Sequence, residues 1–215
     1  MPSAWVLTNV AIIVVSILWG LMFFYIISPL TKTTKKQHFE EIISLLINFV
    51  IFIWVGKILL NLAVFVKDPL AILAYPSNSH AFYVAAFLLL LNVGYKAKRK
   101  KIDTIPILAS FVPVFLGASF AYEFIEITWN ESNLAWGHLI LLTVLIFIYI
   151  FVHEKVSARV AVGGFFVGWS LGQLLLTFFL PFTTLFGYMM ARWFLIAIFI
   201  MSFTLLNYHN RKKVS

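Results

Sequence analysis

The side chain of Lys57 lies within a long and otherwise mostly apolar run, in the stretch FIWVGKILLN of residues 52–61. A charge placed in the hydrocarbon of a membrane costs about 2.5–3.5 kcal/mol on insertion scales, so a compensating interaction is expected. One interpretation is a snorkelling lysine whose ammonium reaches the head groups. The other is an inward-facing cation that holds a lipid phosphate or pairs with a buried carboxylate.

Two carboxylates, Glu123 and Glu126, are three residues apart and therefore share one helical face. They are interpreted either as a solvated helix end or as buried groups that pair with a cation or share a proton with an imidazole. A paired carboxylate and imidazole can perform general acid–base chemistry. The candidate partners in the same half of the membrane are Lys57, Arg192, His80 and His138.

The composition points to an integral membrane protein. Hydrophobic residues make up 62% of the 215 residues and charged residues 11%, with a mean hydropathy of +0.99. A soluble domain usually has about 25% charged residues. No polar linker interrupts the pattern, so residues 1–215 are predicted to form a single transmembrane domain.

The same composition excludes several classes of site. The chain has no cysteine, which excludes disulfides, thiolate catalysis and cysteine-ligated metals. No histidine pair has metal-ligand spacing, so neither a metal nor another cofactor is predicted. The net charge of +8 is interpreted as loop charge that sets topology and contacts anionic lipid, and a nucleic-acid partner is not expected.

Seven segments are long and apolar enough to span a membrane, since a helical span needs about 20 residues. The predicted fold is an all-α bundle of seven transmembrane helices. Most of the 16 lysines and arginines fall in alternate loops, for example Lys98 and Lys155. The positive-inside rule then places the N-terminus outside and the C-terminus in the cytoplasm. The predicted segments are 5–28, 40–66, 80–95, 105–122, 134–152, 160–180 and 184–207.

Two segments have features that affect helix packing. Pro113 is interior to the fourth segment and is expected to kink it, which often accompanies a cavity inside a bundle. The sixth segment has glycines at roughly four-residue spacing, which lets helices approach closely. Gln173 and Thr177, one turn apart in that segment, are interpreted mainly as interhelical hydrogen-bonding groups. The glycines are Gly163, Gly164, Gly168 and Gly172.

Several short stretches occur in a characteristic order: ILWGLMF (17–23), VGKILLN (55–61), DPLAIL (68–73), NSHAFYVAAF (78–87), SFAYEF (119–124) and GWSLGQLLLTF (168–178). Their order and the seven-segment topology resemble the bacterial prolipoprotein diacylglyceryl transferase family, with Lys57 where the family has an arginine. Members of this family move the diacylglyceryl group of phosphatidylglycerol onto the cysteine thiol of a lipoprotein precursor. The resemblance implies a location in the bacterial plasma membrane.

The positions that carry the family's chemistry differ in this chain. Tyr83 stands where the family has its functional histidine, Phe120 and Gln173 stand at two arginines, and Thr177 stands at a glutamate. Losing a hydrogen bond to a charged group costs about 1.5–3 kcal/mol. The resemblance therefore predicts the family's fold and lipid cavity without its usual catalysis.

Three functional hypotheses follow, and whether the chain is an enzyme stays open among them. The favoured one is a membrane protein that binds an anionic phospholipid such as phosphatidylglycerol, or a lipoprotein, in an intramembrane cavity. The second is an active diacylglyceryl transferase with a rearranged site, and the third is a small transporter or an assembly scaffold. The predicted ligand-binding residues are Lys57, Tyr83, Gln173 and Arg192. The candidate catalytic residues are His80 and Glu126.

Overall fold

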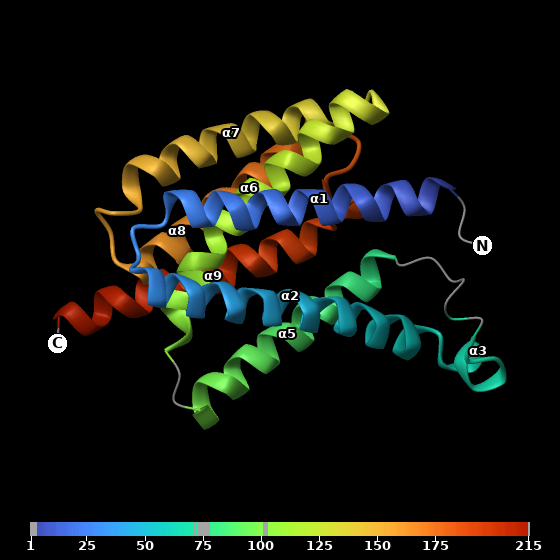
Figure 1. The fold of residues 1–215 in the computed structure, drawn as a ribbon, viewed down its shortest axis with the longest axis horizontal. Coiled ribbons are helices and arrows are strands. Elements are labelled where there is room, and N and C mark those ends of the chain that lie inside the picture. The colour runs from blue at the N-terminus through green and yellow to red at the C-terminus, as the bar shows by residue number, and fades with distance from the viewer. Residues whose placement is uncertain (1–3, 71, 73–77, 101–102, 215) are drawn as a thin grey trace. The chain divides into compact units, whose positions relative to one another are not determined.

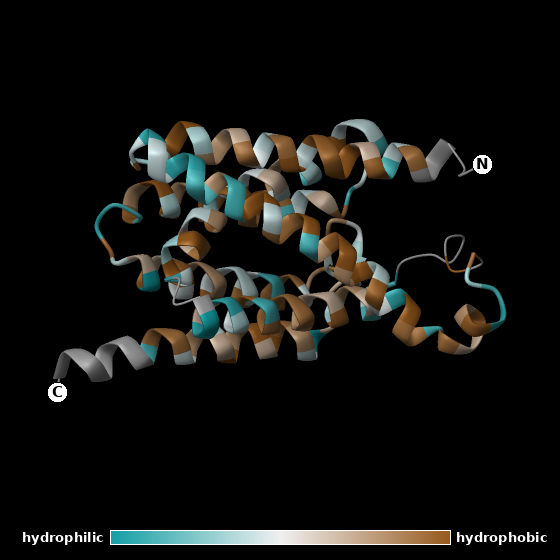
Figure 2. Ribbon diagram, turned by 60° about the horizontal axis from the view of Figure 1, so that its bottom comes forward, coloured by the Kyte–Doolittle hydropathy of each residue, from teal (hydrophilic) through white to brown (hydrophobic). Residues whose placement is uncertain are grey.

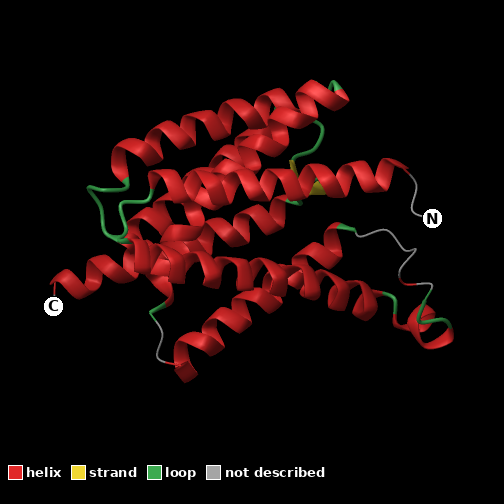
Figure 3. Cartoon of the chain, in the orientation of Figure 1, coloured by secondary structure: helices red, strands yellow, loops and turns green. Residues whose placement is uncertain are grey.

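The computed structural model describes residues 4–70, 72, 78–100 and 103–214. In this part of the chain six helices are long and apolar enough to cross a membrane, which confirms the prediction of a helical, multi-pass membrane protein. A single two-stranded hairpin interrupts the helices (Figures 1 and 3). The elements are α1 (Ala4–Ile27), α2 (Lys32–Leu60), α3 (Leu62–Lys67), α5 (Ser79–Lys100), α6 (Thr104–Asn130), α7 (Ala135–Val152), α8 (Ala158–Leu176), β1 (Thr184–Leu185), β2 (Tyr188–Met189) and α9 (Arg192–Val214).

The chain divides into two compact units. The larger unit comprises Met1–Lys35 and Ile105–Ser215, and therefore holds α1, α6, α7, α8, the hairpin and α9. The smaller unit comprises Lys36–Thr104, with most of α2 together with α3 and α5. The prediction of a single domain stays a prediction.

Each predicted segment coincides with a helix, but several ends differ: α2 begins at Lys32 rather than 40, α5 runs to Lys100 and α6 continues to Asn130. The predicted segment 40–66 is two helices, α2 and α3, separated at Asn61, whose side-chain amide donates to the carbonyl of Lys57 at 2.9 Å. The predicted segment 184–207 begins with the hairpin, and α9 starts only at Arg192. Helix α9 has 23 residues, and the apolar stretch found in it, over the residues whose side chains the structure describes, is Arg192–Asn207. A seventh span therefore stays a prediction.

Glycines allow the helices of the larger unit to approach closely. A side chain on Gly117 of α6 would lie 2.9 Å from the Cβ of Phe23 and 3.1 Å from the Cα of Gly20 in α1. A side chain on Gly20 would in turn meet the backbone of Ala118 at 2.8 Å. The two helices thus cross with a glycine on each side, the arrangement that small residues permit between membrane helices.

Helix α8 makes similar contacts on two of its sides. A Cβ atom added at Gly172 would collide with the side chain of Leu141 in α7. A Cβ atom added at Gly163 would lie 2.7 Å from the side chain of Leu206 in α9. A side chain on Gly168 would likewise lie 3.3 Å from Leu145 of α7, so three of the four glycines have the predicted packing role. Gly164 has no atom within 4 Å of the corresponding position, so it does not take part.

Large apolar side chains remain exposed along the helices, as expected for surfaces that face lipid. Figure 2 shows hydrophobic residues distributed along the helices rather than confined to one buried core. Examples with about half or more of their surface exposed are Leu18, Ile51, Phe87, Phe147 and Leu175. Lipid tails are as apolar as these side chains, so helix association depends on close packing and polar contacts instead.

The glycine crossing between α1 and α6 gives a test of this packing. Gly20→Ala should lower the free energy of unfolding by about 1–3 kcal/mol, because the added methyl group overpacks the crossing. Gly94→Ala in α5 is the matched control, since its methyl group would meet nothing within 4 Å and should stabilise the helix by up to about 1 kcal/mol. Thermal unfolding of the detergent-solubilised variants measures both effects. Equal melting temperatures for the two variants would contradict the tight crossing.

Candidate ligand sites

Lys57 is a buried residue of the smaller unit. Its side chain is 5% exposed, and Nζ lies 4.5 Å from the centre of the Trp54 ring, one turn earlier in α2. No described carboxylate of the smaller unit lies within 4.0 Å of Nζ. A cation–π contact supplies about 0.5–2 kcal/mol, whereas burying an ion costs several kcal/mol. The described residues of this unit thus leave most of the charge uncompensated.

The first turn of α5 lies against the helical turn that carries Lys57. A side chain on Gly56 would lie 2.8 Å from the carbonyl oxygen of Ala81. Asn78 caps this end of α5, because its Oδ1 accepts the backbone N–H of Ala81 at 3.0 Å. The N-terminus of a helix carries a partial positive charge that favours anions. Gly56, the residue before Lys57 in α2, therefore packs against the first turn of α5.

His80 and Tyr83, two of the residues predicted to act in a site, are brought together on the same turn of α5. Their ring centres are 6.1 Å apart in an edge-on arrangement. His80 is exposed and Tyr83 is half-buried. This placement suits Tyr83 as a wall of a ligand site better than it suits His80 as a buried catalytic base.

In the larger unit, α6 carries a stripe of polar side chains near its C-terminal end. Glu123 is 5% exposed, so the interpretation as a solvated helix end is wrong for this residue. Glu126 is half-buried and is held by its neighbours, since Tyr122 donates to it and Asn130 Nδ2 lies 2.9 Å from its Oε2. The charge of Glu126 acts on Glu123, which has no comparable hydrogen bond among the described residues. Ser119 lies one turn before Glu123 on the same face.

Two further polar side chains are buried on α7 and α8. His138 of α7 and Gln173 of α8 are each 2% exposed. The interhelical hydrogen bond predicted for Gln173 stays a prediction. His138 Nδ1 and Gln173 Oε1 have no hydrogen-bond partner among the described residues. The same holds for Ser119 Oγ and Trp169 Nε1, which are also buried.

An aromatic contact aligns α6 with α8. The ring centres of Phe115 and Trp169 are 5.5 Å apart and nearly perpendicular, and the two helices run in the same direction (Figure 1). One turn further along each helix are Ser119 and Gln173, and one more turn along α6 is Glu123. We refer to Ser119, Glu123, His138, Trp169 and Gln173 as the polar cluster.

The hairpin between α8 and α9 packs against the same face of α6. Its two central residues, Phe186 and Gly187, have φ angles of +49° and +81°, as in the turns that match the twist of a hairpin. The ring of Phe186 lies 5.5 Å from that of Tyr122 and 6.4 Å from that of Phe115. A bulky residue at positive φ is strained, so packing must hold it in place.

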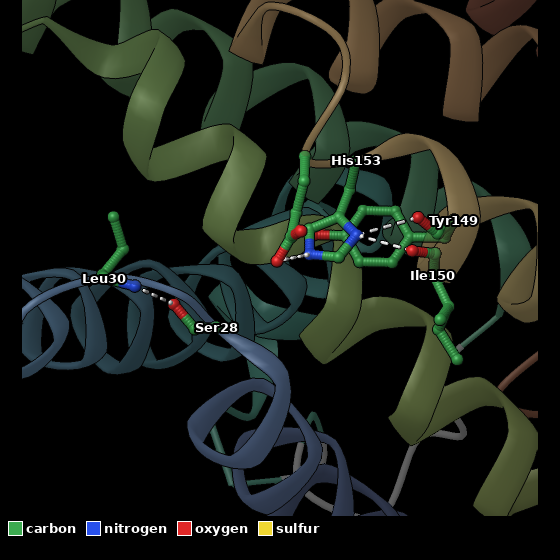
Figure 4. A network of polar contacts seen from close by, with 6 residues as sticks. Ser28, Leu30, Tyr149, Ile150 and His153 are labelled. Atoms are coloured by element: carbon green, nitrogen blue, oxygen red, sulfur yellow. Dashed lines mark hydrogen bonds and ion pairs between the residues drawn. The ribbon is translucent and has the colours of Figure 1, made fainter.

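Arg192 and His153 do not join the polar cluster. Arg192 is exposed at the start of α9, and no described carboxylate lies within 4.0 Å of it, so the suggested pairing with Glu123 or Glu126 is not formed. His153 ends α7, where its Nδ1 lies 3.0 Å from the carbonyl of Tyr149 and its ring stacks on the Tyr149 ring (Figure 4). These local contacts close the end of α7 and form no ligand site.

Sequence reasoning missed Ser119, Trp169 and the hairpin. Ser119 and Trp169 each precede a recognised polar residue by one turn, and that spacing was the available signal. The signals available for the hairpin were Pro181, the two threonines Thr183 and Thr184, and Gly187. Comparisons with models of known protein families, with curated proteins and with solved structures found no match.

The turn of the hairpin gives a second test. Gly187→Ala should destabilise the protein by at least about 1–2 kcal/mol, because alanine is strained at this positive φ. The new Cβ would also lie 3.1 Å from the hydroxyl of Tyr122. In a double-mutant cycle on thermal unfolding, Tyr122→Phe should recover part of the loss by removing that hydroxyl. Strictly additive effects would show that the hairpin does not pack on Tyr122 in this way.

Proposed function

We propose that this chain is a seven-span protein of the bacterial plasma membrane that binds an anionic phospholipid, such as phosphatidylglycerol, through Lys57. In this proposal the N-terminus is outside, the C-terminus is cytoplasmic, and the fold is shared with the diacylglyceryl transferases that the sequence resembles. The observation that carries it is the buried ammonium of Lys57, which has only an aromatic ring as a partner in the described part of its unit.

An anionic head group suits this position for electrostatic reasons. A phosphate would supply the missing counter-charge to Lys57 and would be favoured by the N-terminus of α5. The half-buried Tyr83 on that first turn could add a hydroxyl donor. A lipid delivers its phosphate without a separate path through the membrane, so the apolar helices around the site are compatible with its acyl chains.

Transferase chemistry is not part of the proposal. The resemblance places arginines at the positions of Phe120 and Gln173, and neither side chain carries a positive charge here. Gln173 is fully buried beside the other helices, and Glu126 accepts a hydrogen bond from Asn130. These contacts give both residues structural roles in the larger unit. If expression of this chain restored lipoprotein maturation in a strain that lacks its diacylglyceryl transferase, the chain would be an active transferase.

Binding by Lys57 can be measured with native mass spectrometry of the purified protein and phosphatidylglycerol. Lys57→Leu should weaken binding by about tenfold or more, the equivalent of losing one hydrogen bond to a charged group. Lys57→Arg should retain binding, because the guanidinium keeps the charge. Lys67→Leu, which removes an exposed lysine from α3, is the matched control and should leave binding unchanged. Equal binding by the wild type and Lys57→Leu would refute the proposal.

The proposed topology can be tested with introduced cysteines, because the chain has none of its own. Asn133→Cys lies in the loop between α6 and α7, and Lys155→Cys lies in the loop between α7 and α8; both positions are exposed. A membrane-impermeant maleimide added to intact cells should label Asn133→Cys and spare Lys155→Cys. After the cells are broken, both should react. The reverse pattern in intact cells would invert the orientation.

A further inference from the structure

An exposed apolar face of α5 continues into a cationic end of the same helix. Phe87, Leu91 and Tyr95 follow one another at one-turn spacing, and each has more than half of its surface exposed. Lys98 lies about three turns beyond Phe87 and therefore on the same side of the helix, and Arg99 lies one turn beyond Tyr95. Both cations are exposed. One side of a single helix thus runs from apolar side chains through a tyrosine to two positive charges.

The two cations at this end of α5 have no acidic partner. No carboxylate of the described residues lies within 4.0 Å of the side-chain nitrogens of Lys98 or Arg99. Lys96 differs from them, because its Nζ lies 3.3 Å from Glu41 Oε2 and its charge is neutralised by this ion pair with α2. Among the described side chains, the positive charge left for another molecule at this end is therefore that of Lys98 and Arg99.

The guanidinium of Arg99 is held close to the ring of Tyr95. Its Cζ lies 5.7 Å from the centre of that ring, a distance at which a cation is attracted by the face of an aromatic side chain. Tyrosine is typical of the interface between membrane and water. Arginine at such an interface is suited to bind a phosphate, because its guanidinium donates two parallel hydrogen bonds.

The length of this face matches one leaflet of a membrane. From Phe87 to Arg99 the helix rises about 18 Å. One leaflet contributes about 15 Å of hydrocarbon, which is half of the whole core. Acyl chains that lie along Phe87 and Leu91 therefore bring the phosphate of the same lipid to the level of Lys98 and Arg99.

We propose that this face of α5 binds one anionic phospholipid, with its acyl chains along Phe87 and Leu91 and its phosphate at Lys98 and Arg99. These four residues, together with Tyr95, are called the α5 lipid stripe. The stripe ends in the last turn of α5, whereas the turn that carries Lys57 packs against the first turn. The two sites are thus at opposite ends of the helix, and the stripe does not depend on lipid binding at Lys57.

The test counts the phospholipids that stay bound to the full-length protein in native mass spectrometry. With phosphatidylglycerol, the wild type should retain two lipids and Lys57→Leu one. Adding Lys98→Gln and Arg99→Gln to Lys57→Leu should weaken binding of the remaining lipid by about 30-fold, since each basic side chain near an anionic head group contributes about fivefold. The matched control adds Lys67→Gln and Lys155→Gln, which remove the same charge from exposed positions elsewhere and should leave binding unchanged.

Two ligand comparisons in the Lys57→Leu protein distinguish a lipid from other anions. Phosphatidylcholine has no net charge and should bind at least about tenfold more weakly than phosphatidylglycerol. Glycerol 1-phosphate has the phosphate but no acyl chains, so an equimolar amount should not displace the bound lipid. Displacement would contradict the part of the stripe that holds the acyl chains.

The proposal is overturned if Lys57→Leu binds no phosphatidylglycerol. It is also overturned if removal of Lys98 and Arg99 leaves that binding unchanged, even where the cationic end then proves to bind an acidic protein. If the variant without these two cations should fail to fold, the comparison of lipids decides, because equal binding of phosphatidylcholine and phosphatidylglycerol would exclude recognition by charge.

Discussion

A polar group buried among membrane helices must find a partner, because neither lipid tails nor bulk water can provide one. This constraint organises both units of the chain. Glu126 accepts a hydrogen bond from Asn130, and His153 closes the end of its own helix. Lys57 and Glu123 are left without such partners among the described residues of their units.

The two remaining buried charges have opposite signs and lie in different units. Lys57 in the smaller unit calls for an anion, whereas Glu123 in the larger unit loses its charge when it takes up a proton. Glu123 therefore gives no reason by itself to expect a ligand. Lys98 and Arg99 differ from both, because they are exposed at one end of α5 and their charges are not buried.

Sequence reasoning located the helices well because apolar runs of membrane length leave few alternatives. It also identified Lys57, Gln173 and both carboxylates as unusual at membrane depth. It could not decide which of them are buried, because helical spacing defines a face but not what covers that face. Trp169 escaped notice for the same reason, since its unpaired nitrogen exists only once Phe115 and the other helices have packed around it. The hairpin was missed because its residues continue the apolar pattern of α9.

Phe186 occupies a backbone conformation that its own side chain disfavours, and it does so while packed on Phe115 and Tyr122. The strained backbone of the turn is therefore expected to relax once Phe115 and Tyr122 shift. Disturbance of the helix interior should reach this short connection early, before the long helices lose their hydrogen bonds. Amide protection at β1 and β2 would accordingly act as a sensitive reporter of whether the packing beneath them is intact.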